Sequence, residues 1–564
     1  MEPRPSLSAA PATGAPPAAH SARRWWALIA IAASLLVVGL DLTVLNLALP
    51  TIAGDLHAST GDLQWISSAY SLVLAAAILP AGLLGDRYGR KRVLLIALAL
   101  FGVSSALCAY AASVGELIAA RALLGVGAAA IMPLALSVLP VMFTAAERPR
   151  AIVVITSTTF ISFPIGPIVG GVLLDHFWWG SVFLINVPVV VLAVTAVAVL
   201  LPESRSADRP GIDIVGVILS SAGLAGLTYG FIKAGQDGWT DAVALGTIAT
   251  GVVVLAVLVT WERWLTGRDR TGSGGSLRGG AIRPLIELRL FRSAGFTWGT
   301  ILATLVSFAM FGIFFAMPQY FQEVRGADAM GSGLRLLPMI GGMVIGMIGS
   351  TRLASPRQAP DGTASAPLAS VKGLVAVGFA IMAITLGFGA TTTVGSGTGF
   401  AAAWFAVFGF GLGLAMPQTM NAALSALSAE RSGAGSALIS AMRQVGATIG
   451  VAILGTVISS AYRSRLTVPG VPAPVASAAR SSVGVGIEVA HKLGSAPLLA
   501  AVRTAYVHGL DLMLWVCGGI ALACALLALA FLPRAPRGGQ PPEAPPAPQR
   551  EPEAQWRRGA DVRS

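Results

Sequence analysis

Charged residues are scarce in this chain. Only 11% of its 564 residues are Asp, Glu, Lys or Arg, whereas a soluble domain has roughly 25%. Hydrophobic residues make up 55% and the mean hydropathy is +0.75. Such a chain cannot cover a water-soluble core with polar surface, which excludes an ordinary soluble protein. Lipid is therefore the expected solvent for most of it.

Cysteine is also scarce, and metal-ligand clusters and phosphate-binding glycine loops are missing from the sequence. Cys108, Cys517 and Cys524 lie in apolar runs, which favours packed hydrophobic residues over disulfides or a metal site. No soluble segment is long enough to house catalysis, so we expect neither an enzyme nor a sensor. An ion channel is disfavoured because no repeated pore loop or ring of acids is present.

Long apolar runs are what the sequence has in abundance. A window of about 19 residues predicts fourteen membrane-spanning helices, and hence an all-α polytopic membrane protein. The predicted spans are 27–50, 63–84, 93–112, 117–141, 151–173, 181–201, 212–234, 242–264, 296–317, 332–353, 372–391, 400–421, 437–460 and 508–532.

Arginine alternates between loops and predicts the orientation. The loops 51–62, 113–116, 174–180 and 235–241 contain no Lys or Arg, whereas the loops between them contain Arg clusters. By the positive-inside rule, we expect a multi-pass protein of the cytoplasmic membrane with both termini cytoplasmic. The net charge of +12 is explained in the same way, so nucleic-acid binding is not expected.

An internal repeat divides the chain. A set of four residues recurs with the same spacing, and each copy precedes an Ala-Glu-Arg triplet, at 146–148 and 429–431; the copies are Gly125, Gly127, Met132 and Pro133, then Gly409, Gly411, Met416 and Pro417. Chance matching of Gly-rich helices is the alternative. Because both copies lie on helices running outside to inside, the halves are predicted to be parallel repeats.

The repeat and the spans together predict the domain organisation. It comprises a disordered cytoplasmic tail at 1–24, a six-helix bundle at 25–201, two inserted helices and a cytoplasmic loop at 202–295, a second six-helix bundle at 296–533 that includes a long outer segment at 461–507, and a disordered cytoplasmic tail at 534–564.

Asp41 is the most informative residue because it lies inside the first predicted span. An ionisable group there costs about 2.5–3.5 kcal/mol and must face protein or a water-filled cavity. Burial disfavours the charged form, so this carboxyl group is a candidate for binding and releasing a proton, and its anion for attracting a cationic substrate. The alternative is an Asp that only hydrogen-bonds neighbouring backbone.

Arg121, near the outer end of the fourth span, is a second buried charge. A guanidinium at that depth needs a partner, and Asp41 fits by depth and sign. Substrate or conformation could then move a proton by changing their separation. Snorkelling to the outer interface is the alternative for Arg121.

Two glycine-rich motifs are also candidates. The inner loop between spans two and three would make a tight turn and inner-face ion pairs that hold one conformation, or would be an ordinary basic loop; its residues are Gly82, Asp86, Arg87, Gly89, Arg90, Lys91 and Arg92. The motif in the fifth span predicts a kink and close helix packing, with or without a coupling role; its residues are Gly166, Pro167, Gly170 and Gly171.

Together these motifs resemble the fourteen-helix drug:proton antiporter branch of the major facilitator superfamily over roughly residues 25–533. The inner-loop string and the fifth-span motif match, as do a first-helix motif of Asp41, Thr43, Val44, Asn46, Ala48 and Pro50, and a fourth-helix motif of Arg121, Gly125 and Gly127. Two features depart from the pattern. Ser68 stands where many relatives have Asp, and the second inner-loop copy near 352–357 is degenerate.

The resemblance implies two six-helix bundles plus two inserted helices that rock about a central cavity. Inward proton flow, worth about 2.3 kcal/mol per 100 mV, would drive export of small lipophilic drugs or antibiotics, cations among them. An exporter dedicated to one metabolite or self-made antibiotic is the alternative. No cofactor is expected beyond the proton, and no partner beyond small-molecule substrates and the lipid bilayer; we expect a monomer.

Overall fold

The computed structural model is a bundle of long helices. It describes residues 18–143, 147–201, 203, 213–268, 288–354, 357–358, 364–365, 368–425, 432–467 and 472–533. The predictions for the chain ends 1–17 and 534–564, for the triplet 429–431 and for the side chain of Asp86 lie outside the described residues.

The described residues up to 268 form nine α-helices. They are α1 (Ala18–Asp55), α2 (Thr60–Tyr88), α3 (Arg90–Ala109), α4 (Val114–Met142), α5 (Arg148–His176), α6 (Ser181–Leu184), α7 (Asn186–Leu200), α8 (Ile214–Asp237) and α9 (Ala242–Arg268).

The second part is also helical apart from a two-residue antiparallel pairing of β1 (Arg357–Gln358) with β2 (Ala364–Ser365). Its helices are η1 (Leu288–Arg292), α10 (Ala294–Gln319), η2 (Tyr320–Val324), α11 (Ala329–Ala354), α12 (Val371–Gly389), α13 (Thr398–Leu424), α14 (Ser432–Arg465), α15 (Ala473–Ala479), α16 (Val483–Lys492) and α17 (Ala496–Phe531).

Each of the fourteen predicted spans falls on a helix. Within the described residues, 12 helical segments are long and apolar enough to cross a membrane, by length and composition. The other two predicted spans fall on α2 and α5, helices of 29 residues each that include side chains outside the description. The predicted all-helical membrane fold is therefore confirmed.

The predicted ends of several helices were wrong. α1 continues through Pro50 to Asp55, and α2 and α3 extend until only Gly89 separates them. α17 begins at Ala496, so the predicted outer segment 461–507 is largely helical. Hydropathy detects only the apolar part of a helix, whereas continuing backbone hydrogen bonds carry helices beyond it.

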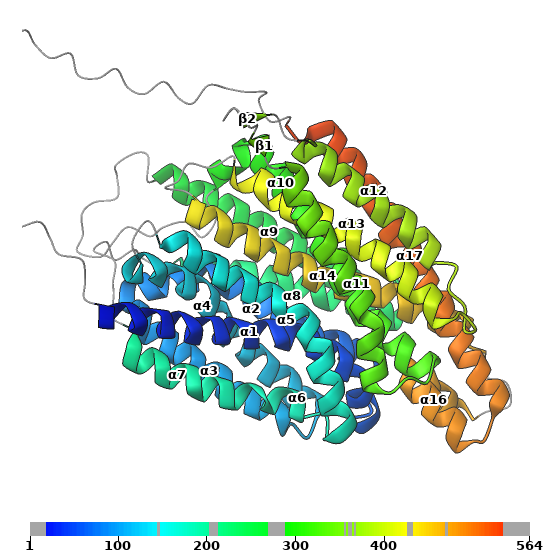
Figure 1. Ribbon diagram of the computed structural model, residues 1–564. Helices are drawn as coiled ribbons and strands as arrows, with labels where there is room; N and C mark the ends of the chain where they lie inside the picture. The colour runs from blue at the N-terminus through cyan, green and yellow to red at the C-terminus, as the bar shows by residue number, and fades with distance from the viewer. Residues whose placement is uncertain are drawn as a thin grey trace, which may run out of the picture.

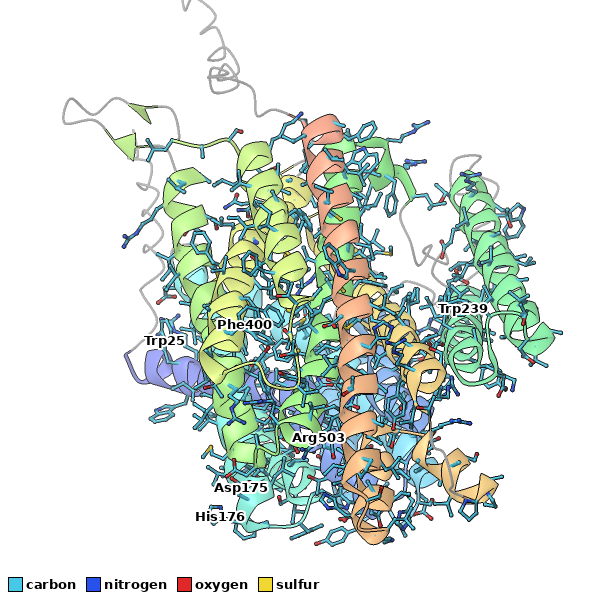
Figure 2. The ribbon with its side chains drawn as sticks, turned by 90° about the vertical axis from the view of Figure 1, so that its right-hand side faces the viewer. Trp25, Asp175, His176, Trp239, Phe400 and Arg503 are labelled. Carbon is cyan, nitrogen blue, oxygen red and sulfur yellow. The ribbon has the colours of Figure 1, made fainter. Side chains whose placement is uncertain are left out.

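The helices gather into two halves (Figure 1). We call α1 to α7 the first half and α10 to α17 the second half. The hairpin of α8 and α9 packs against α2 and α14, one helix from each half. In Figure 2 this hairpin, which carries Trp239, stands at one flank of the molecule. The inserted pair therefore lies beside the two halves, against α2 and α14.

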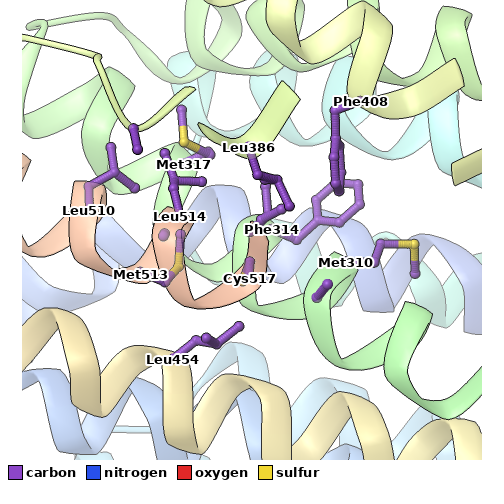
Figure 3. Packing of buried hydrophobic residues seen from close by; sticks show 14 of the residues in the cluster. Met310, Phe314, Met317, Leu386, Phe408, Leu454, Leu510, Met513, Leu514 and Cys517 are labelled. Atoms are coloured by element: carbon purple, nitrogen blue, oxygen red, sulfur yellow. The ribbon is translucent and has the colours of Figure 1, made fainter. Parts of the chain in front are cut away.

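Each half has its own apolar core. In the second half, large side chains from five helices interdigitate (Figure 3): Met310 and Phe314 from α10, Leu386 from α12, Phe408 from α13, Leu454 from α14, and Met513 and Cys517 from α17. Such close packing resists continuous deformation. Motion of this half as a body is consequently easier than rearrangement within it.

The internal repeat has a three-dimensional counterpart. On α4, a Cβ at Gly125 would lie 2.7 Å from the Tyr70 carbonyl oxygen on α2, and one at Gly127 would lie 2.9 Å from the Ala97 carbonyl oxygen on α3. On α13, Gly409 meets the α11 backbone and Gly411 the α12 backbone in the same way. The repeated glycines let a central helix touch two neighbours closely in each half.

We expect Gly125→Ala to destabilise the protein, because its methyl group would press on the α2 backbone. Overpacking of this kind costs about 1–3 kcal/mol, so the thermal midpoint in detergent should fall by several degrees. Gly115→Ala, on the same helix with no atom within 4 Å of the added Cβ, should leave the midpoint unchanged or higher. Equal midpoints for the two variants would contradict the packing argument.

Candidate functional site

A buried ion pair joins α1 to α4. Nη1 of Arg121 donates to Oδ2 of Asp41 at 2.6 Å, and both side chains are 1% exposed. Nε of Arg121 also donates to the Ile66 carbonyl oxygen on α2, at 3.3 Å. The structure thus places the two charges singled out by the sequence in direct contact, and Arg121 does not snorkel to the surface. Three helices of the first half meet at this point.

Aromatic rings enclose the guanidinium. The Arg121 guanidinium carbon lies 4.6 Å from the ring centroid of Tyr70 and 5.9 Å from that of Phe183. Both rings are buried, which favours cation–π attraction and excludes water from this side of the pair. Within the described residues, the Tyr70 hydroxyl has no hydrogen-bond partner. It is a polar group held inside the membrane beside the charges.

The sequence analysis missed Tyr70 and Phe183. A lone tyrosine inside an apolar run was the available signal for Tyr70, whereas Phe183 looks like any lipid-facing ring. Ser68, the departure from the family pattern, is buried, and its hydroxyl has no hydrogen-bond partner among the described residues. Its position on α2 therefore remains polar although the carboxyl group is replaced.

The close contact at Gly125 fixes the position of Arg121 along α2. Arg121 contacts Ile66, and Gly125, one turn later on α4, contacts Tyr70, one turn later on α2. The two helices therefore run in the same direction at close range. The fourth-helix motif thus combines a charged residue, Arg121, with a small residue, Gly125, which lets α4 approach α2 closely enough for Arg121 to contact it.

The fifth-helix glycines pack α5 against the first-helix motif. A Cβ at Gly166 would overlap the Thr43 side chain, and one at Gly170 would lie 2.9 Å from Cγ1 of Val44. This confirms the predicted close packing; the predicted kink stays a prediction. Thr43 and Asn46 hydrogen-bond to α1 carbonyl oxygens one turn earlier. Pro50 is buried within α1.

The same motif reaches the second half. A Cβ at Gly171 would lie 2.6 Å from the Cα of Met330 on α11, and one at Gly333 would overlap the Pro167 carbonyl oxygen. Asp175, near the end of α5, accepts hydrogen bonds from the backbone N–H groups of Ala329 and Met330 at 3.2 Å each. Figure 2 shows Asp175 beside His176 at one end of the molecule.

Further hydrogen bonds between the halves lie at this same end, which we call the predicted outer end. Nε2 of Gln322 donates to the Leu47 carbonyl oxygen at 2.9 Å. Oγ1 of Thr60, at the start of α2, donates to the Ser481 carbonyl oxygen at 3.0 Å. One turn later, Nε2 of Gln64 donates to the Ala452 carbonyl oxygen on α14 at 3.0 Å. No sequence pattern had pointed to these partners.

The inner-loop motif is a one-residue turn. Gly89, with φ of +109°, ends α2 and starts α3, a conformation that favours glycine. Nη1 of Arg90 donates to the Ser137 carbonyl oxygen on α4 at 2.8 Å, and Nζ of Lys91 to that of Ala198 on α7 at 2.6 Å. These contacts lie within the first half.

The remaining inner-loop residues are less engaged. The Arg87 guanidinium lies 5.6 Å from the Tyr88 ring centroid, and Arg92 is exposed. A Cβ at Gly82 would meet nothing closer than 3.9 Å. The expected ion pairs of Asp86 stay a prediction, because its side chain is outside the description. In the described part of the chain, no group of three or more His, Cys, Asp or Glu could hold a metal ion.

We expect Asp41→Ala to lower the stability of the purified protein by about 3–5 kcal/mol, because it leaves the Arg121 guanidinium buried without a counter-charge. The double variant Asp41→Ala with Arg121→Leu should lose less, since neither charge remains. Thermal unfolding in detergent measures both. Asp55→Ala, at the exposed end of α1, serves as the control. A double variant that loses the sum of its single effects would contradict the pairing.

Comparison with known proteins agrees with this architecture. Residues 31–451 match the model of the Major Facilitator Superfamily. The chain is 33% identical to the tetracenomycin C resistance and export protein of Streptomyces glaucescens, covering 93% of this chain and 95% of that one. It is 35% identical to the multidrug efflux pump LfrA of Mycolicibacterium smegmatis, covering 90% of this chain and 96% of that one.

A solved structure shows the same fold. A bacterial homologue of the human lysosomal transporter Spinster superposes with a TM-score of 0.62 at 16% identity, covering 90% of this chain and 98% of that one. The family model matches most of the chain, and the efflux and resistance proteins match it over nearly their whole length. The chain therefore belongs to the Major Facilitator Superfamily and is a membrane transporter, not an enzyme.

Proposed function

We propose that this transporter exports small molecules from the cytoplasm in exchange for protons. The observation that carries the proposal is the Asp41 and Arg121 pair, a carboxylate and a guanidinium in contact and almost wholly buried in the first half. A carboxyl group at this depth can take up a proton only if the ion pair is given up. Its protonation therefore changes the electrostatics between α1 and α4, and couples a proton to the packing of these helices.

The contacts between the halves support a sequence of events. They gather at the predicted outer end, so we assign this conformation to a state open toward the cytoplasm, with both termini on that side. Substrate would enter from the cytoplasm while Asp41 is ionised and paired. After the halves rock, a proton from outside would neutralise Asp41 and release the substrate. Loss of that proton to the cytoplasm would restore the pair.

The relatives support drugs and antibiotics as the substrate class. Two are named multidrug efflux or resistance proteins, and another is named for resistance to methyl viologen in Salmonella typhimurium, at 30% identity. The relative named for tetracenomycin C export favours the second candidate, an exporter dedicated to one compound. A resistance panel in a host lacking its own exporters separates an exporter of many drugs from an exporter of one compound. Protection against several unrelated compounds supports the exporter of many drugs.

We expect Asp41→Asn to reduce proton-driven dye uptake into everted membrane vesicles at least tenfold, because the amide keeps the shape of the side chain but cannot bind and release a proton. Ethidium and fluorescein serve as dyes, with and without an uncoupler. Asp55→Asn, on the same helix but exposed, should transport like the wild type. Undiminished, uncoupler-sensitive uptake by Asp41→Asn would remove this residue from proton coupling.

We expect Asp175→Ala to shift the protein toward a state open at the predicted outer end, because α11 loses two charge-assisted hydrogen bonds from α5. A cysteine at Ala53, which is 2% exposed near this end of α1, would report the change. Its labelling by an impermeant thiol reagent in intact cells should become several-fold faster.

Asp328→Ala is the matched control for this shift. Asp328 caps the same end of α11 through the N–H of Gly331, but within the second half. Its loss should weaken the helix end without separating the halves. Labelling that accelerates equally in both variants would show local fraying of α11 and contradict the assigned role of Asp175.

A further inference from the structure

A second intramembrane arginine lies in the other half. Arg443 belongs to the part of α14 that is long and apolar enough to span a membrane. Its Nε donates to Oγ of Ser307 on α10 at 3.3 Å, and its Nη1 contacts Sδ of Met420 on α13 at 3.8 Å. The sequence analysis did not single it out, although a charge within the predicted span 437–460 was visible.

The Arg443 side chain points toward Ser307 on α10, away from the predicted inner end of α14. Gly446 on α14 lies level with Thr304 on α10, because a Cβ there would overlap the Thr304 carbonyl oxygen. Arg443 is one turn before Gly446, and Ser307 is one turn beyond Thr304. Ser307 therefore lies further from the predicted inner end than Arg443 does, and the guanidinium points toward the middle of α10. A snorkelling arginine would extend the other way.

Neutral groups are the partners of this charge. Arg121 in the first half faces a carboxylate at 2.6 Å, whereas the contacts of Arg443 are a hydroxyl and a thioether. Among the ion pairs of the described residues, none involves Arg443. Charges inside a membrane pair with an opposite charge or face a water-filled cavity. Arg443 is only partly buried.

We propose that Arg443 is the anchor for an acidic group, a carboxylate or phenolate, on an aromatic substrate. This inference rests on the proposed export function and specifies its substrate class. The planar guanidinium can donate two parallel hydrogen bonds to such a group, and Met420 supplies a polarisable apolar contact for the attached ring. The anion would supply the opposite charge that Arg443 lacks among the ion pairs of the described residues.

In the described part of the first half, the carboxylate that the sequence suggested for a cation already has a partner. The sequence suggested that ionised Asp41 would attract a cationic substrate, but the structure pairs this carboxylate with Arg121. The pair as a whole is close to neutral. Acidic substrate and proton thus use different side chains in different halves, and do not compete for one group.

The test compares an anionic dye, fluorescein, with a cationic dye, ethidium, in energised everted vesicles. Arg443→Gln should lower fluorescein uptake at least tenfold and leave ethidium uptake within twofold. Arg443→Lys, which keeps the charge but loses the planar fork, should fall between. Arg465→Gln, at the exposed end of α14, should match the wild type.

Other outcomes separate this inference from the proposed function. Wild-type vesicles that take up ethidium but not fluorescein would overturn the anion anchor and leave export intact. Wild-type vesicles that take up neither dye would contradict the export function as well. Equal loss of both dyes in Arg443→Gln would indicate a structural role and overturn the proposal.

Binding to purified protein keeps the proposal testable without transport. Fluorescence polarisation should show fluorescein binding to the wild type, and at least tenfold weaker binding to a folded Arg443→Gln variant. If that variant does not fold, Arg443→Lys decides: weaker fluorescein binding with unchanged ethidium binding supports the anchor. Unchanged fluorescein binding in the folded variant overturns it.

Discussion

The contact between Asp41 and Arg121 is the interaction on which the first half depends. Neither side chain could remain inside a membrane alone at acceptable cost, and together they form a neutral unit with 1% exposure each. The guanidinium also binds the α2 backbone and lies over the Tyr70 ring. A change in the charge of Asp41 therefore alters contacts among three helices, α1, α2 and α4.

Close helix packing limits how the helices around this pair can move. Glycines at the α1 to α5 and α2 to α4 contacts leave no room for a methyl group, so these helices cannot slide past one another in small steps. Packed interiors respond to strain by switching between arrangements. α5 also packs against α11 of the second half, where Asp175 accepts hydrogen bonds from two backbone N–H groups of α11.

The two halves repeat their packing but not their charges. Gly125 and Gly127 have counterparts in Gly409 and Gly411, with the same neighbouring helices. The Asp41 and Arg121 pair has no such counterpart among the ion pairs of the described residues, and Arg443 occupies a different depth and helix. The glycine packing is thus repeated between the halves, whereas this ion pair is not repeated in the described residues.

The sequence by itself determined the helical membrane class, the repeat and the first-half charge pair. Its count of fourteen spans stays a prediction, since 12 helical segments of the described residues are long and apolar enough to cross a membrane. Hydropathy and charge are properties of residues, so lipid acts on them whatever the tertiary contacts. Only the tertiary structure decided where α1 ends and α17 begins, that α15 and α16 form helices in the 461–507 segment, and which atoms join α5 to α11. It also decided that the Arg443 side chain contacts Ser307 on α10. These features depend on groups far apart in the chain, whose meeting no local pattern encodes.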